Sequence, residues 1–350
     1  MTLLKHSVKE STYRSYQYYA FPVSILVSHM EQNEGVEAWI HSNFIQACFD
    51  ERLFDGGVPV PFAPYQFDYA FNPWLHTQRL SRELVGMLDL DILSFIVKSL
   101  THGFCLYLNA DEFFLPNRQF YQKQNYSHDV LIYGVDTEQE RLFLMGYDDN
   151  SQYTTFEAGY DEFRQAYQSL DVIENHCNQI YLYRYQPEGS YTFQIHLVLD
   201  LIEDYLYSRN TSERLYMVAE PYDRTYGQNT IASVQRYLQL LMEGRIEFDI
   251  RIIHYLVEHK EAMLHRLRYL ERKKYLDQSL GFADTYAEQV YGQALMYRNM
   301  IMKSAIDNNS KRVQSVIGSL DQMRQDEHEL LVRMVTHARE RAAKPLQEFN

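Results

Sequence analysis

The sequence is poor in cysteine and has no long uninterrupted apolar stretch. Its three cysteines, Cys48, Cys105 and Cys177, form no Cys-x-x-Cys pair and no even-numbered framework, which is typical of proteins in a reducing compartment. No apolar run approaches the roughly 20 residues that a membrane-spanning helix needs. The first residues contain no apolar segment of the kind found in secretory signals. We therefore expect a cytoplasmic protein that does not act at a membrane.

Basic residues are outnumbered by acidic ones. The chain has 33 lysines and arginines against 47 aspartates and glutamates, which gives a formal net charge of −14. This balance argues against nucleic acid and anionic membranes as partners. P-loop, Gly-x-Gly-x-x-Gly and His-Glu-x-x-His motifs are also missing, so we expect neither a bound cofactor nor a metal ion.

The chain is long enough, and apolar enough, for two domains. It has 350 residues, of which 46% are hydrophobic. Strand-like runs occupy residues 104–109, 130–133, 141–145, 153–156 and 178–184, and helical patterns occupy residues 36–49, 80–88, 91–100 and 160–168. After the turn signal at residues 187–189, almost every apolar pattern has helical spacing. We predict an α+β fold with an antiparallel sheet over residues 1–186 and an all-α helical bundle over residues 190–340.

A histidine and two aspartates flank neighbouring strands of the predicted sheet. His128 stands just before the run 130–133, and the run 141–145 ends at Asp148 and Asp149. In an antiparallel pair joined by a short turn, the start of the first strand lies beside the end of the second. We therefore predict that His128 hydrogen-bonds Asp148 or Asp149. A carboxylate that orients an imidazole is the base half of a Cys/Ser–His–Asp system.

Three segments in this region carry a resemblance to a known family. DEFFLP (residues 111–116), HDVLIYG (128–134) and GYDD (146–149) occur in this order. In these segments, and over about residues 10–185, the chain resembles the butirosin biosynthesis protein H N-terminal domain family, and more distantly the papain-like cysteine peptidases. The resemblance implies a papain-like fold and an acyltransferase or thioesterase of bacterial antibiotic biosynthesis. It further implies an acyl or peptidyl carrier protein as a partner, with the substrate on its phosphopantetheine, and a small-molecule amine as the acceptor.

The position of the nucleophile departs from the pattern of that family. The resemblance places it at the start of the first long helix, where Ala20 occupies the expected slot and no cysteine is present. Ser24 is the only nearby nucleophile, and the alternative is a helix serine that bonds back to a carbonyl. Gln17 is either the oxyanion donor or a surface glutamine. Cys48 and Cys105 lie among apolar residues and are expected to be buried thiols.

Three kinds of function therefore remain open. The first is an acyltransferase or thioesterase in which Ser24, His128 and Asp148 act together. The second is a catalytically degenerate papain-like scaffold that only binds partners. The third uses His128 with an acidic partner as a general base, without a covalent intermediate.

One stripe in the helical half also needs an interpretation. His254, Glu258, Glu261 and His265 recur at helical spacing and fall on one face of a single helix. Such a set could bind a metal ion only with ligands from other helices, because it extends over three turns. We interpret it as the solvated shoulder of an amphipathic helix.

Overall fold

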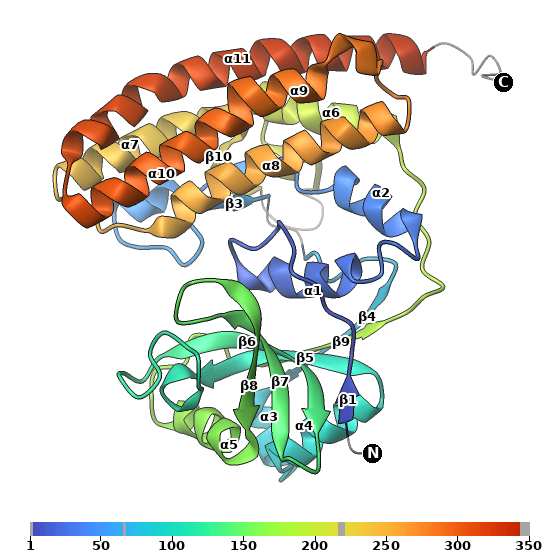
Figure 1. Cartoon of the computed structure of the whole chain (residues 1–350), viewed down its shortest axis with the longest axis vertical. Helices are drawn as coiled ribbons and strands as arrows, with labels where there is room; N and C mark the ends of the chain where they lie inside the picture. The colour runs from blue at the N-terminus through green and yellow to red at the C-terminus, as the bar shows by residue number, and fades with distance from the viewer. Residues whose placement is uncertain (1–2, 66–67, 216–220, 344–350) are drawn as a thin grey trace. The chain divides into compact units, whose positions relative to one another are not determined.

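The computed structural model describes residues 3–65, 68–215 and 221–343, and these residues fall into two compact units (Figure 1). Unit 1 combines Met1–Glu37 with Asp68–Tyr191, and unit 2 combines Ala38–Phe67 with Thr192–Asn350. Helices and antiparallel sheets together make up the fold, so the α+β class predicted from the sequence is confirmed. In the described parts of the chain, no helix is both long enough and apolar enough to span a membrane.

Unit 1 is built on a seven-stranded sheet of order β4-β9-β5-β6-β7-β8, with β1 paired to β6 beyond this path. All of its strand pairs are antiparallel. In chain order its elements are β1 (Leu3–Lys5), α1 (Gln17–Val27), β4 (Leu75–Ser81), α3 (Arg82–Met87), α4 (Ile92–Thr101), β5 (Phe104–Asp111), the 3-10 turn η2 (Glu112–Phe114), β6 (Ser127–Asp136), β7 (Arg141–Tyr147), β8 (Tyr153–Gly159), α5 (Tyr160–Gln168), the 3-10 turn η3 (Ser169–Asp171) and β9 (Gln179–Tyr185). α2 (Glu34–Ser42) continues from unit 1 into unit 2.

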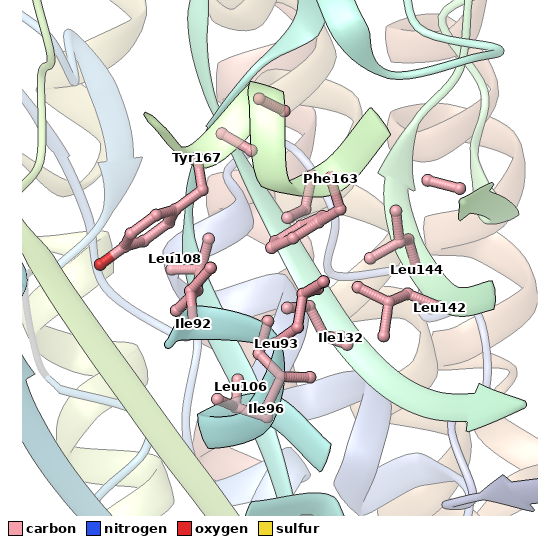
Figure 2. Packing of buried hydrophobic residues seen from close by; sticks show 14 of the residues in the cluster. Ile92, Leu93, Ile96, Leu106, Leu108, Ile132, Leu142, Leu144, Phe163 and Tyr167 are labelled. Carbon is pink, nitrogen blue, oxygen red and sulfur yellow. The ribbon is translucent and has the colours of Figure 1, made fainter. Parts of the chain in front are cut away.

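One face of this sheet packs against α4 and α5. Because side chains alternate along a strand, Leu106 and Leu108 of β5 and Ile132 of β6 all point to this face. Figure 2 shows them against Ile96 of α4 and Phe163 of α5, both fully buried. Each side chain of this size stabilises the fold by about 1.5–3 kcal/mol through burial. This core fixes the strand register, since a one-residue slip would turn every side chain to the other face.

The opposite face of the sheet is covered by α1. Phe21 of α1 lies edge-on to Tyr107 of β5, with ring centroids 5.0 Å apart. The Ser24 hydroxyl is 3.0 Å from that of Tyr153 in β8. The first turn of α1 thus comes to the sheet at the end where β6 begins, which is where His128 stands.

Unit 2 is mostly helical and also contains a small sheet of order β10-β2-β3. Its described elements are β2 (Ala47–Phe49), η1 (Glu51–Phe54), β3 (Phe62–Pro64), α6 (Ile195–Leu206), η4 (Thr211–Leu215), β10 (Thr225–Tyr226), η5 (Gly227–Asn229), α7 (Thr230–Met242), α8 (Ile250–Arg272), η6 (Gln278–Leu280), α9 (Phe282–Tyr286), the π-helical turn η7 (Ala287–Tyr291), α10 (Gly292–Asp307) and α11 (Ser310–Ala342). The helices α6, α7 and α10 pack against α11.

A buried ionic network joins four of these helices. The ammonium of Lys260 in α8 lies 2.8 Å from the Glu327 carboxylate in α11, and both side chains are at most 2% exposed. Tyr205 of α6 donates to the same carboxylate at 2.7 Å, and Tyr286 of α9 donates at 2.5 Å. Every charge in the network has a partner, as buried charges require.

The predicted domain boundaries need one correction. The sequence assigned residues 38–67 to the first domain, whereas they belong to unit 2. Arg266 of α8 donates to the carbonyls of His41 and Asn43 at 2.8 and 2.5 Å, and His259 lies 2.8 Å from the carbonyl of Ile45. The strand β2 also pairs with β3 and with β10, and none of these strands joins the large sheet. These long-range bonds leave no signal in local apolar spacing.

Two predicted helices are shorter than expected. The helix predicted over residues 36–49 ends at Ser42, because Phe44 adopts a left-handed backbone conformation (φ 56°) and residues 47–49 form β2. The helix predicted over residues 80–88 starts only at Arg82, where the Ser81 side chain accepts from the Leu84 N–H as the N-cap. Residues 75–81 form β4, at the end of the sheet.

The His–Glu stripe of α8 is also different from the solvated shoulder that we predicted. Glu258 is 6% exposed, and His265 and Glu261 are partly buried. α8 is covered on most of its circumference, because its neighbours include both α10 and β3. Among the residues that the structure describes, no group of three or more His, Cys, Asp or Glu side chains is arranged to hold a metal ion.

Candidate functional site

The site begins with Asp111, which shapes the turn that follows β5. Its carboxylate accepts hydrogen bonds from the backbone N–H groups of Phe113 (3.0 Å) and Tyr126 (2.9 Å) and from the Ser169 hydroxyl (2.9 Å). One fully buried side chain thereby ties together the end of β5, the residue before β6 and the end of α5. This N-cap starts the 3-10 turn η2 and fixes the direction of Glu112, its first residue.

Glu112 forms the acidic half of a carboxylate–imidazole pair with His128. The antiparallel register places His128 opposite Ala110, two residues before Glu112. The Glu112 Oε1 atom lies 2.5 Å from His128 Nδ1, and the Glu112 side chain is 3% exposed. Its backbone N–H also donates to the Tyr126 carbonyl at 2.9 Å. The carboxylate is therefore held rigidly beside the imidazole.

Arg118 completes the cluster from the far end of the same turn. Its guanidinium is fully buried, lies 2.6 Å from Glu112 Oε1, and donates to the carbonyls of Tyr147 (2.5 Å) and Asp129 (3.3 Å). It is also 2.9 Å from His128 Nδ1. Since a guanidinium only donates and a carboxylate only accepts, these two contacts require opposite tautomers of His128. We assign the Nδ1 proton to the shorter contact, with Glu112.

This tautomer gives His128 the form of a general base. Burial by itself would raise the pKa of Glu112, but the hydrogen bond from His128 and the charge of Arg118 outweigh it, and the pKa is lowered. The carboxylate is therefore ionised at neutral pH and orients the ring through Nδ1. His128 keeps 31% of its side chain exposed, and no described residue hydrogen-bonds its Nε2. The Nε2 lone pair is thus available to a substrate.

Gln17 reaches the same cluster from the first turn of α1. It is 6% exposed, so it is not the surface glutamine of the alternative interpretation, and its Nε2 donates to the Asp129 carbonyl at 3.4 Å. Arg118 donates to this same carbonyl, so the two side chains meet beside His128. A Cβ atom at Gly146 would lie 2.6 Å from Arg118 and 3.2 Å from Gln17. Glycine at this position therefore leaves room for both side chains as they lie.

The predicted hydrogen bond of His128 to Asp148 or Asp149 is wrong, because Glu112 occupies the imidazole Nδ1. Asp148 instead accepts from the backbone N–H groups of Asn150 and Gln152, at 2.9 and 2.7 Å, and closes the turn between β7 and β8. Asp149 accepts from the Asn150 side chain at 2.9 Å. The β6–β7 pairing begins only at Leu131 and Met145, so the ladder stops before it reaches His128.

The predicted nucleophile, Ser24, does not have the position of one. Its side chain is fully buried on the α1 face of the sheet and hydrogen-bonds Tyr153, whose pKa is raised by burial. The expected bond back to a helix carbonyl is not formed either. Ala20, where the resemblance predicts the nucleophile, is also fully buried. Neither residue can attack a substrate beside His128.

The cysteines offer no substitute. Cys48 and Cys105 are 7% and 2% exposed, which confirms that they are buried thiols. Burial raises the pKa of Cys105 to about 12, so its thiolate is negligible at neutral pH. Burial also raises the pKa of Cys177, which is partly exposed.

Sequence reasoning missed Glu112 and Arg118. Glu112 lies inside the DEFFLP segment, and Arg118 follows it two residues after Pro116. The buried Leu115 lies between them. The useful signal was the carboxylate of Glu112 directly after β5, because β5 pairs with β6, the strand that contains His128. Comparisons with protein families and with curated proteins give no match to this chain.

Proposed function

We propose that unit 1 is a papain-like domain that performs acyl transfer by general-base catalysis, without a covalent acyl-enzyme. The observation that carries the proposal is the Glu112–His128 pair, which leaves the His128 Nε2 free while no thiol or hydroxyl occupies the nucleophile slot at Ala20. The arrangement of α1 against the sheet, with its N-terminus beside the histidine strand, supports the papain-like assignment. The resemblance to the butirosin biosynthesis protein H N-terminal domain family supports a carrier-bound acyl or peptidyl thioester as the substrate.

In this mechanism the acceptor itself is the nucleophile. His128 Nε2 removes a proton from an amine, or from water, as its nitrogen or oxygen attacks the thioester carbonyl carbon. The resulting imidazolium is stabilised by Glu112 through Nδ1. When the tetrahedral intermediate collapses, the C–S bond breaks and the imidazolium returns the proton to the departing thiol. The N–H group of Gln17 that is not bonded to Asp129 would donate to the oxyanion.

The test is turnover of an acyl thioester by the full chain, with a simple amine as the acceptor. His128→Asn should lower kcat by about 10²–10⁴, the usual contribution of a positioned base. The control is His102→Asn, because His102 is exposed and bonds only the Lys98 carbonyl of its own helix. Iodoacetamide should leave turnover unchanged. Turnover that survives His128→Asn would refute the proposal.

A second candidate, a scaffold that only binds its partner, is favoured by Arg118. This buried guanidinium neutralises Glu112 and thereby weakens its support of an imidazolium. On this alternative the protein binds an acylated carrier protein with no turnover, and His128→Asn leaves the dissociation constant unchanged. The same pair of variants therefore separates the two functions.

A further inference from the structure

β8 is an edge strand of the large sheet and has little of the usual protection of such an edge. It is the last strand on the path that ends β6-β7-β8, and its pairing with β7 runs over seven residues without a register shift. Natural edge strands are usually shortened, bulged, or marked by proline or charged side chains, because their free backbone groups recruit other strands. β8, with the sequence YTTFEAG, has no bulge, proline or lysine, and its one charged residue is Glu157.

The hydrogen-bond pattern shows which backbone groups of β8 point away from the sheet. The Asp148 N–H donates to the Gln152 carbonyl, and the Tyr160 N–H donates to the Glu140 carbonyl, both at 2.9 Å. Hydrogen-bonded positions alternate along an antiparallel ladder, so residues 154, 156 and 158 also bond β7. The N–H and C=O groups of Thr155 and Glu157 therefore face outward. No described residue bonds them.

The free edge ends at a defined point. The outward N–H of Gly159 is occupied by the Glu162 carboxylate, at 2.6 Å, in the capping box that starts α5. An added strand would therefore pair with β8 up to Glu157 and no further. Thr155 and Glu157 are about 6.8 Å apart along the strand, which is the repeat of a two-residue step in a β-ladder.

A groove follows this edge and carries excess negative charge. It has a volume of about 820 Å³ and is lined by residues 154–159 of β8, by Pro116 and Asn117, and by the β7–β8 turn. Four carboxylates line it, from Asp148, Asp149, Glu157 and Glu162, against the single guanidinium of Arg141. Arg141 is already paired with Glu157 at 3.1 Å.

We propose that β8 is a docking edge for an extended, lysine- or arginine-rich segment of another protein, which adds to the sheet as a further strand. Main-chain bonds to Thr155 and Glu157 would hold the segment, and its cationic side chains at alternate positions would meet the carboxylates of the groove. A second copy of this chain fits poorly, because pairing β8 with itself would bring the same four carboxylates together. This surface goes beyond the proposed reaction and uses none of its catalytic residues.

The test removes one outward N–H without disturbing the fold. Thr155→Pro deletes a donor that β7 does not use, and proline is tolerated at such edge positions. Thr155→Val is the matched control, because it also loses the hydroxyl but keeps the N–H. The probe is a fluorescent acetyl-Val-Lys-Val-Lys-Val-Lys-Val-amide peptide, titrated into the full chain and followed by polarisation. Thr155→Pro should weaken binding at least tenfold, and Thr155→Val by less than twofold.

Two further measurements test the backbone N–H groups of the peptide and the negative charge of Glu157. The same peptide N-methylated at alternate residues should bind at least tenfold more weakly to the wild-type chain, which requires no variant to fold. Glu157→Gln should weaken binding about two- to fivefold, in keeping with an exposed charge pair, and should flatten the salt dependence.

The proposal is overturned by absence of binding at millimolar peptide, or by equal binding of a peptide with glutamate in place of lysine. A concentration-dependent dimer in sedimentation velocity that Thr155→Pro abolishes would also overturn it, because the edge would then belong to a second copy.

Discussion

Removal of the Glu112 carboxylate should destabilise unit 1 strongly, because it leaves the buried charge of Arg118 without the carboxylate that contacts it. Arg118 and Glu112 are 0% and 3% exposed at their side chains, so water can compensate neither. Breaking such a pair by removing one partner typically costs about 3–5 kcal/mol. We expect Glu112→Gln to lower the free energy of unfolding by this amount, even though the amide keeps the shape of the side chain.

Arg118→Met should cost at least as much, because the guanidinium also satisfies two backbone carbonyls. The Tyr147 carbonyl would lose its donor, which costs about 1–3 kcal/mol for a buried group left unsatisfied. The Asp129 carbonyl would keep only the bond from Gln17. The double variant Glu112→Gln/Arg118→Met should be less destabilised than the sum of the single variants. The coupling free energy expected for groups in direct contact is about 0.5–3 kcal/mol.

The assay is urea unfolding followed by tryptophan fluorescence. The chain has two tryptophans, of which Trp74 is fully buried in unit 1 and Trp39 lies in unit 2. In a Trp39→Phe background the signal reports unit 1 alone. With a slope of about 2 kcal/mol per molar urea, the midpoint should fall by about 2 M in Glu112→Gln. A midpoint within about 0.3 M of the parent, which is roughly 0.6 kcal/mol on that slope, would refute the reasoning.

The acid side of the stability curve gives an independent check. Because the pKa of Glu112 is lowered in the folded protein, its stabilising effect is complete above the unfolded value of about 4.3. It is lost as the pH falls through the lower, folded pKa. Glu112→Gln should therefore remove part of the stability that the parent loses on acidification below about pH 5. Parallel curves for the two proteins would contradict the assigned ion pair.

Three further predictions follow from other parts of the structure. Ser24→Ala should leave acyl transfer unchanged and cost about 1 kcal/mol in urea unfolding, the usual net contribution of one hydrogen bond, here that to Tyr153; loss of turnover with an intact fold would restore Ser24 as a nucleophile. Iodoacetamide at pH 8 should alkylate Cys177 before Cys105, whose pKa is about 12, as peptide mass spectrometry would show. Turnover lost together with alkylation of Cys48 would mean that we misplaced the nucleophile. Lys260→Met should destabilise unit 2 by about 3–5 kcal/mol, measured through Trp39 in a Trp74→Phe background, because it leaves Glu327 buried without a cation; an unchanged midpoint would contradict this.

Much of the large sheet could be predicted from the sequence. The five strand-like runs coincide with β5, β6, β7, β8 and β9, because each is an apolar or aromatic run bounded by turn residues. Among the strands that were not predicted are β4 of the large sheet and β2 of the small one. The apolar pattern of α2 continues into β2, although the left-handed backbone of Phe44 separates the two elements. β4 has a weakly apolar pattern with several exposed positions.

The candidate site was only half predictable. His128 was found because it stands at the start of a clear strand. Its carboxylate partner was predicted among the residues that follow it, at Asp148 or Asp149, whereas Glu112 precedes it. The choice of Glu112 depends on the register that pairs Ala110 with His128 and on the Asp111 cap, and both are three-dimensional facts. Asp148 follows the strand β7 as predicted, but its side chain accepts hydrogen bonds from the backbone of its own turn.

The assignment of residues 38–67 to unit 2 has a consequence for how the chain folds during synthesis. The strand that completes the sheet of this segment, β10, is made roughly 180 residues after β2. At about 5–20 residues per second, β2 waits on the order of 10–35 s for that partner. Unit 1 can finish first, with this segment held out as a loop. Fragments that end before residue 225 should therefore expose the apolar strands β2 and β3 and require a chaperone to remain monomeric.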